Sequence, residues 1–229
     1  MLSTLDQLRA NQLWSEGAPL RLHLGCGEQR FDGYVNIDFP PDQHAVMTVR
    51  PDLEADITRL SFPSESVNEI RLHAVFEHFD RVTALGLLIR WHGWLKRGGL
   101  LVLETPDFIE TAKRAIAASG VDRMGFIRHL EGDQSSPWGM HIGQWYPERF
   151  HRTLSALGFA DIETETSTTE EWHRVGLANV TARARKAAHL PLMSLLSTAE
   201  GILWESTVAD AERPTWEVWR TQLRDFVLR

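Results

Sequence analysis

Two glycines that flank a cysteine, Gly25, Cys26 and Gly27, are the residues of this chain best suited to hold a ligand against the backbone. They follow residues 20–24, whose short apolar sequence LRLHL predicts a buried strand. Glycine adopts backbone angles that other residues avoid, and it leaves no side chain between a ligand and the peptide N–H groups. The pattern predicts a ligand-binding turn that holds a polar group. The rival interpretation is an ordinary tight turn.

An aspartate ends the next predicted strand, YVNID at residues 34–38. The carboxylate of Asp38 offers acceptors to both hydroxyls of a diol, at the carboxyl edge where open sheets bind ligands. Alternatively, Asp38 only caps the turn at Pro40. We interpret Cys26 as a small packing residue rather than a nucleophile, because no base is adjacent to it in the sequence.

Three polar residues follow the fourth predicted strand: His73, Glu77 and His78. If helical geometry begins directly after that strand, His73 and Glu77 lie four residues apart on one face. Such a set could move a proton in catalysis. Its spacing matches no dedicated zinc motif, so we predict no metal. The alternative is that Glu77 and His78 only form hydrogen bonds at the start of the next helix.

A segment rich in glycine and proline, residues 120–147, is predicted to be a long loop or lid. It contains His141, with Trp145 and Tyr146 close by in the sequence. His141 could deprotonate an acceptor hydroxyl as the segment closes over the site, or it could simply pack the loop. Together with Trp138, the two aromatic residues offer surfaces suited to a sugar ring.

Alternating strand and helix patterns predict an α/β domain with a mostly parallel sheet and one antiparallel strand. The predicted strands cover residues 20–24, 34–38, 53–57, 68–74, 100–106, 159–166 and 175–185, and the predicted helices cover residues 3–14, 81–95, 108–119 and 147–157. The crossover between the first two strands has little room for a helix. We assign residues 1–186 to the domain and residues 187–229 to a helical tail.

The overall composition excludes several classes of protein. A net charge of −7 over 229 residues gives no electrostatic footprint for nucleic acid. No run approaches the roughly 18 apolar residues that span a bilayer. The chain has one cysteine, so we predict a soluble cytoplasmic protein. In the tail, Trp204, Trp216 and Trp219 could pack back on the domain, or contact a partner protein or the second copy of a homodimer.

Five segments occur in a specific order: LHLGCG, NID, ADI, RLHAVFEHF and LKRGGLLVLETPD. Together they resemble the class I S-adenosylmethionine-dependent methyltransferases, in particular the methyltransferase type 11 group and related enzymes found with polysaccharide biosynthesis. The resemblance covers roughly residues 20–186. It implies a Rossmann-like class I methyltransferase fold with a seven-stranded sheet, and S-adenosyl-L-methionine as the cofactor.

The resemblance also implies which residues hold that cofactor. They are Gly25, Cys26 and Gly27 at the methionine end, Asp38 at the ribose hydroxyls, Asp56 and Ile57 beside the adenine, and the Leu72 and His73 backbone beside the sulfonium. Two positions depart from the family's usual residues. His23 stands where an acidic residue is common, and Gln29 where a third glycine is common.

The function predicted from these observations is methyl transfer to an oxygen, or alternatively a nitrogen, of a small molecule or glycan. The predicted catalytic residues are His141, His73, Glu77 and His78. One alternative is a non-catalytic methyltransferase-like scaffold that binds a glycan-processing partner. Another is a nicotinamide- or nucleotide-binding enzyme, although Arg30 occupies the third glycine position of G-x-G-x-x-G and Asp38 comes too early for the usual acidic residue.

Overall fold

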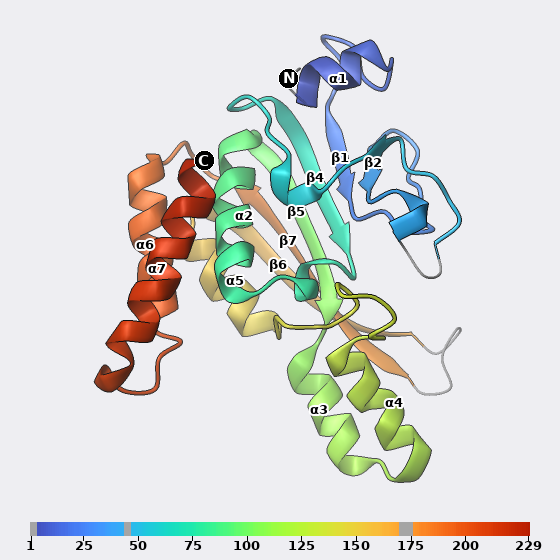
Figure 1. Ribbon diagram of the computed structural model, residues 1–229, viewed down its shortest axis with the longest axis vertical. Helices are drawn as coiled ribbons and strands as arrows, with labels where there is room; N and C mark the ends of the chain where they lie inside the picture. Colours follow the sequence, from blue (N-terminus) through green and yellow to red (C-terminus); the bar gives the residue numbers. More distant parts are fainter. Residues whose placement is uncertain (1–3, 44–46, 170–175) are drawn as a thin grey trace.

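The computed structural model describes residues 4–43, 47–169 and 176–229, which form a seven-stranded sheet in the order β3-β2-β1-β4-β5-β7-β6 (Figure 1). The strands are β1 (Arg21–Leu24), β2 (Val35–Asp38), β3 (Leu53–Glu54), β4 (Val67–His73), β5 (Leu95–Pro106), β6 (Phe159–Thr169) and β7 (Leu177–Lys186). Strand β7 is antiparallel to both of its neighbours, and the other neighbouring pairs are parallel. The predicted mostly parallel sheet with one antiparallel strand is confirmed.

Seven α-helices accompany the sheet in the described part of the chain. They are α1 (Thr4–Ala10), α2 (Arg81–Trp94), α3 (Phe108–Ala117), α4 (Gly120–Glu131), α5 (Pro147–Ala156), α6 (Leu192–Trp204) and α7 (Arg213–Leu228). Four short 3-10 turns also occur, at Pro41–Gln43 (η1), Ile57–Arg59 (η2), Phe76–His78 (η3) and Asp210–Glu212 (η4). In the described ranges, no helix has the length and apolar content needed to cross a bilayer.

The short crossover between β1 and β2 contains no helix, as the sequence predicted. The side chain of Asn36 holds this segment in place. Its Oδ1 accepts from the Phe31 N–H at 2.8 Å, and its Nδ2 donates to the Phe31 carbonyl at 3.2 Å. Nδ2 also donates to Asp52 at 2.8 Å. Because these hydrogen bonds satisfy buried backbone groups, the crossover needs no regular structure of its own.

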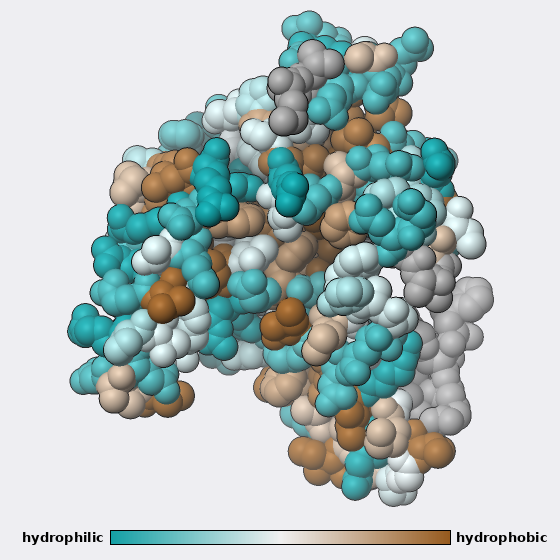
Figure 2. Space-filling view, viewed as in Figure 1, coloured by the Kyte–Doolittle hydropathy of each residue, from teal (hydrophilic) through white to brown (hydrophobic). Residues whose placement is uncertain are grey.

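The predicted lid is partly a helix, and the prediction of a loop over all of residues 120–147 was wrong. Helix α4 occupies the first twelve positions of the segment and packs against α3. Both prolines of the segment, Pro137 and Pro147, lie after this helix, so its backbone N–H groups remain available for helical bonding. Figure 2 shows apolar side chains over the α3 and α4 pair, where Ile116 and Met124 are exposed.

The helical tail packs back on the domain. Helices α6 and α7 lie against α2, and Leu196, Leu203 and Leu223 are fully buried in the common core (Figure 1). Gly86 of α2 admits the ring of Phe226, because a Cβ built at Gly86 would lie 2.4 Å from Phe226 Cδ1. Of the two arrangements open for the tail tryptophans, the structure shows packing on the domain for Trp216 and Trp219, which are partly buried against the core.

Candidate functional site

A cavity of about 740 Å³ lies at the carboxyl ends of β1, β2 and β4. The predicted cofactor residues that line it are Gly25, Cys26, Gly27, Asp38, Asp56, Ile57 and His73. Ligands of open α/β sheets bind at this edge. Leu72 is not among the lining residues, because its side chain is fully buried in the hydrophobic core.

The turn after β1 has a conformation that depends on glycine. Gly25 and Gly27 have φ values of 71° and 52°. A Cβ built at Gly25 would lie 2.4 Å from Val75 Cγ2, whereas one at Gly27 would have no atom within 4 Å. The N–H of Gly25 donates to the carbonyl of Ile37 at 2.8 Å, which ties the turn to β2. Gly25 therefore allows close approach to Val75, and Gly27 leaves open space beside the backbone.

Asp38 links the turn to the end of β2. Its Oδ2 accepts from the Gly27 N–H at 2.7 Å, and its Oδ1 accepts from the Phe39 N–H at 2.7 Å. The side chain is buried yet lines the cavity. These contacts fix the carboxylate at the cavity wall, where it can also receive a ligand's hydroxyl group.

Cys26 is 4% exposed, and burial raises the pKa of its thiol to about 12. The thiol is therefore neutral at physiological pH, which makes it a poor nucleophile. This supports the interpretation of Cys26 as a packing residue.

Asp56 and Ile57 lie on the same cavity, but not in a strand as the sequence predicted. Strand β3 ends at Glu54, and Asp56 caps the turn η2. Its Oδ1 accepts from the N–H and the hydroxyl of Thr58, at 2.9 and 2.6 Å. Because aspartate competes well for local backbone donors, it ends the strand and begins the turn.

His73 and Glu104 face each other across the cavity wall. The register of β4 and β5 pairs these two residues, and His73 Nδ1 lies 3.5 Å from Glu104 Oε2. The same oxygen accepts from the Thr181 hydroxyl at 3.1 Å. The hydrogen bond from His73 lowers the pKa of Glu104 below its ordinary value. The ionised carboxylate can therefore accept from the imidazole and orient it.

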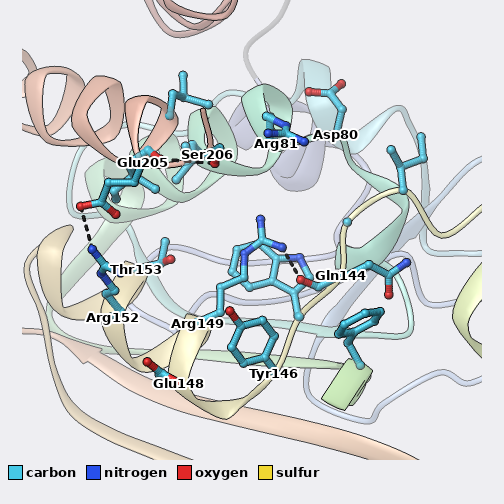
Figure 3. Close-up of a pocket in the computed structure, with 17 residues that line it drawn as sticks. Asp80, Arg81, Gln144, Tyr146, Glu148, Arg149, Arg152, Thr153, Glu205 and Ser206 are labelled. Carbon is cyan, nitrogen blue, oxygen red and sulfur yellow. Dashed lines mark hydrogen bonds and ion pairs between the residues drawn. The ribbon is translucent and has the colours of Figure 1, made fainter. Parts of the chain in front are cut away.

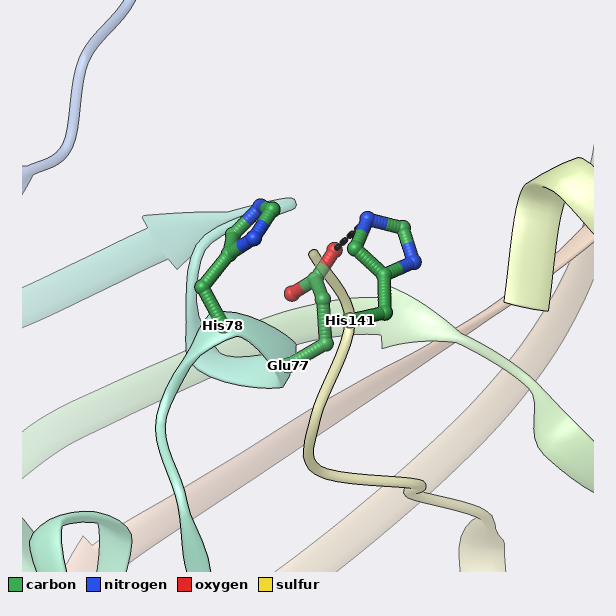
Figure 4. Close-up of side chains that lie close together, drawn as sticks. All are labelled: Glu77, His78 and His141. Carbon is green, nitrogen blue, oxygen red and sulfur yellow. Dashed lines mark ion pairs between the residues drawn. The ribbon is translucent and has the colours of Figure 1, made fainter. Parts of the chain in front are cut away.

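The predicted helical pairing of His73 with Glu77 was wrong. Ala74 has a φ of 51°, and helical structure begins only at Phe76. Glu77 instead lies buried behind the cavity wall, with Oε1 3.8 Å from His141 Nε2 (Figure 4). Burial raises the pKa of Glu77 to about 8.

His141 lies beside Glu77 and is not a lining residue of the cavity. Its Nδ1–H donates to the His129 carbonyl at 2.9 Å, and its ring packs edge-on against His78 with centroids 4.8 Å apart. Burial, followed by the neighbouring His78, lowers its pKa to about 4. Of the four predicted catalytic residues, His73 and His78 line the cavity, whereas Glu77 and His141 lie behind it.

Several lining residues were not assigned to the site from the sequence. Phe39, Val75, Phe79 and Asn179 all face the cavity. Phe39 lies against Trp138, the tryptophan identified as a surface for a sugar ring, with ring centroids 5.3 Å apart. The position of Phe39 directly after Asp38 was an available signal. Asn179 had none, because only the antiparallel pairing of β7 with β5 brings it to this edge.

A second cavity of about 470 Å³ lies between α2, α5 and α6 (Figure 3). It shares no lining residue with the first. Arg152 forms an ion pair with Glu205 at 2.8 Å across it, and the Arg149 guanidinium stacks on Trp145 at 4.1 Å. These side chains are paired with one another. The cavity offers a ligand no backbone surface comparable to the turn at Gly25 and Gly27.

The sheet order and the seven strands define a Rossmann-like methyltransferase fold. Among solved structures, an S-adenosylmethionine-dependent methyltransferase from Archaeoglobus fulgidus matches with a TM-score of 0.51 and 16% identity, over 79% of this chain and 92% of that chain. A putative methyltransferase from Bacillus halodurans matches with a TM-score of 0.49 and 14% identity, over 81% and 99% of the two chains. Human N-acetylserotonin methyltransferase, solved in complex with S-adenosylmethionine, gives 0.46 and 18%, over 80% and 56%.

A scan against protein-family profiles finds no match, and a search of curated proteins finds none either. The likeness at this level of identity establishes the fold.

Proposed function

We propose that this protein is an S-adenosylmethionine-dependent methyltransferase that acts on an oxygen of a small molecule or glycan. The observation that carries the proposal is the combination, on one cavity, of the glycine turn with the carboxylate of Asp38. The fold it shares with the methyltransferase from Archaeoglobus fulgidus supports the same conclusion.

The cavity fits the proposed cofactor in its chemistry. Gly27 leaves open space beside the backbone, which suits the amino-acid end of the cofactor. Asp38 offers carboxylate oxygens to the ribose diol, and Ile57 offers an apolar side chain to the adenine. When bound, the cofactor supplies a methyl group on a positively charged sulfur. In such a transfer the O–C bond to the acceptor would form as the S–C bond breaks, with the sulfur retaining the bonding electron pair.

The protein contributes alignment and removal of a proton. Holding the acceptor in line can lower the barrier by about 7 to 11 kcal/mol, whereas a general base contributes about 100- to 10,000-fold. We assign the base role to Nδ1 of His73 rather than to His141, because His73 lines the cavity, its Nδ1 lies 3.5 Å from Glu104 Oε2, and its Nε2 is buried. The proton leaves the acceptor hydroxyl for the imidazole, and the Glu104 carboxylate stabilises the resulting positive charge.

The acceptor class is inferred from the aromatic wall of the cavity. Phe39 and Trp138 together form a ring surface that suits a sugar. This favours the glycan acceptor and the association with polysaccharide biosynthesis over a nitrogen acceptor on a small base. We also propose a reducing cytoplasm as the compartment, because Cys26 is a free buried thiol.

Isothermal titration calorimetry with S-adenosylmethionine and S-adenosylhomocysteine tests the proposal. Wild type should bind both, and Asp38→Ala should weaken both by at least tenfold. Asp42→Ala, an exposed acidic position four residues later, is the matched control and should bind as wild type does. A protein that binds neither compound would favour the scaffold function, and one that binds NAD instead would favour the nicotinamide enzyme.

A further inference from the structure

Three side chains of types that can bind metals come together at the cavity wall. Glu77, His78 and His141 each offer one donor atom, and these atoms all lie within 4.8 Å of one another (Figure 4). The loop that carries His141 is fixed to the backbone of Glu77, because the N–H groups of Ile142 and Gly143 donate to the Glu77 carbonyl at 2.9 and 2.8 Å. The main chain therefore holds together residues that are far apart in the sequence.

Both imidazoles are oriented by backbone carbonyls. His78 Nδ1–H donates to the Met140 carbonyl at 3.0 Å, and His141 Nδ1–H donates to the His129 carbonyl at 2.9 Å. A neutral imidazole whose proton is on Nδ1 has its lone pair on Nε2. This is how metal-ligating histidines are held in proteins, with the second ring nitrogen donating to an outer partner.

Glu77 supplies the third donor. Its side chain is only 2% exposed, and neither carboxylate oxygen has a hydrogen-bond partner. Glu77 Oε1 lies 3.8 Å from His141 Nε2, which is too far for a hydrogen bond. Buried carboxylates without partners are rare because their desolvation is costly, and a bound cation removes that cost.

We propose that Glu77, His78 and His141 bind one divalent transition-metal ion, with zinc as the representative case. Zinc–ligand bonds of about 2.0 Å in tetrahedral geometry place the donor atoms roughly 3.3 Å apart. Side-chain movements of about 1 Å bring the present donor atoms to that separation. Two imidazoles and one carboxylate suit zinc and its neighbours, and three protein ligands leave one position open. Magnesium prefers oxygen ligands and fits this donor set poorly.

The sequence prediction of no metal followed from the residue spacing and from the fact that methyl transfer itself needs no metal. The third ligand comes 63 positions after His78, the difference between 141 and 78, and no local motif announces it. His78 also lines the cofactor cavity, so the proposed ion adjoins the site of the proposed methyl transfer. Metal binding does not depend on that function, and a failure to bind S-adenosylmethionine would leave the metal proposal intact.

The test is titration of the chelator-treated, dialysed full chain with zinc chloride, followed by calorimetry. We expect one equivalent to bind and the thermal unfolding midpoint to rise. Magnesium chloride at the same concentration should have no effect. Cobalt(II) chloride provides a second readout, because a tetrahedral cobalt site absorbs visible light strongly. Absence of stoichiometric zinc binding would overturn the proposal.

Four variants locate the site. His78→Asn, His141→Asn and Glu77→Gln should each weaken zinc binding by at least tenfold, whereas His151→Asn, at an exposed position on α5, should not change it. If Glu77→Gln does not fold, the two histidine variants decide the question, since both positions are only partly buried. Wild-type zinc affinity in both histidine variants would assign the ion elsewhere and refute the site.

Discussion

The backbone N–H of Gly27 donates to Oδ2 of Asp38 at 2.7 Å, so the residue proposed to hold the ribose also holds the glycine turn. The neighbouring oxygen of Asp38 accepts from the Phe39 N–H. The two contacts together require that both carboxylate oxygens of Asp38 accept a hydrogen bond. One side chain therefore fixes the part of the cavity wall proposed to face the methionine end and the ribose of the cofactor.

Asp38→Asn retains one acceptor oxygen but places an NH₂ group opposite a backbone donor. We expect this variant to weaken S-adenosylmethionine binding by about 10- to 100-fold, because one charge-assisted hydrogen bond is lost and the turn loosens. Calorimetric titration measures the effect. An affinity within twofold of wild type would show that neither the charge nor the second acceptor matters.

Gly25→Ala should destabilise the turn. The positive φ of Gly25 disfavours any side chain, and the added Cβ would overlap Val75. We expect a loss of at least about 2 kcal/mol in the free energy of unfolding, together with loss of cofactor binding. Gly201→Ala is the contrasting control. Gly201 lies inside α6 with no atom near its missing Cβ, so alanine should stabilise the protein by about 0.5 to 1 kcal/mol. Urea denaturation of both variants tests the pair.

His73→Gln should reduce turnover by about 100- to 10,000-fold, the usual contribution of a general base. Cofactor affinity should stay within about threefold of wild type, because its principal contacts are proposed at Asp38 and the glycine turn. Glu104→Gln should lower turnover less, since it acts through His73. Once the acceptor is known, steady-state kinetics beside calorimetry separates these effects. A parallel loss of affinity and turnover would instead identify His73 as a cofactor-binding residue.

Stability should fall as the pH drops from about 6.5 to about 4, in part because of His92. This side chain is 1% exposed, and burial, followed by the charge of Lys186, lowers its pKa to about 4. At pH values between these two pKa values, His92 is protonated in the unfolded chain and neutral in the folded chain. The free energy of unfolding therefore decreases toward acid, by about 3 kcal/mol for this histidine.

His92→Phe should flatten that profile, because phenylalanine cannot take up a proton in either state. Chemical denaturation at a series of pH values measures the slope. The buried His23, whose pKa burial also lowers to about 4, contributes in the same direction and stays in the variant. His151→Asn, at an exposed position, should leave the slope unchanged. An equal slope in wild type and His92→Phe would contradict the prediction.

Docking of the tail should depend on a single glycine of α2. Gly86→Ala would overlap the Phe226 ring and should cost about 1 to 3 kcal/mol in unfolding free energy. Gly93→Ala, about two turns further along the same helix, meets no atom and serves as the matched control. Thermal unfolding of the two variants compares them directly. If Gly86→Ala unfolds at the same temperature as Gly93→Ala, the contact does not hold the tail.

Local patterns predicted most of the sheet because strands such as β1 and β5 carry apolar runs and several turns carry a glycine or a capping residue. Asp80 illustrates this point, because it directly precedes α2 and its side chain accepts from the Val82 and Thr83 N–H groups at 2.8 and 2.9 Å. The pairing of His73 with Glu104 could not be read this way. It follows from the register of two strands, which only the folded sheet sets.

The predicted pairing of His73 with Glu77 failed because the backbone changes direction between these two residues. Ala74 adopts a positive φ that alanine rarely takes, and this turns Glu77 away from His73 and toward His141. No feature of the residues 73–78 announces that change. The position of His141 behind the cavity follows from the same turn, because its loop bonds to the Glu77 backbone.

Helix α2 lies over the sheet and packs against α6 and α7 (Figure 1), and ten of its residues are buried. A chain truncated after β7 would expose to water the apolar face of α2 that α6 and α7 cover. We expect such a fragment to self-associate and precipitate. Residues 187–229 thus cover an apolar surface, and without them the rest of the chain would not stay dispersed as single molecules.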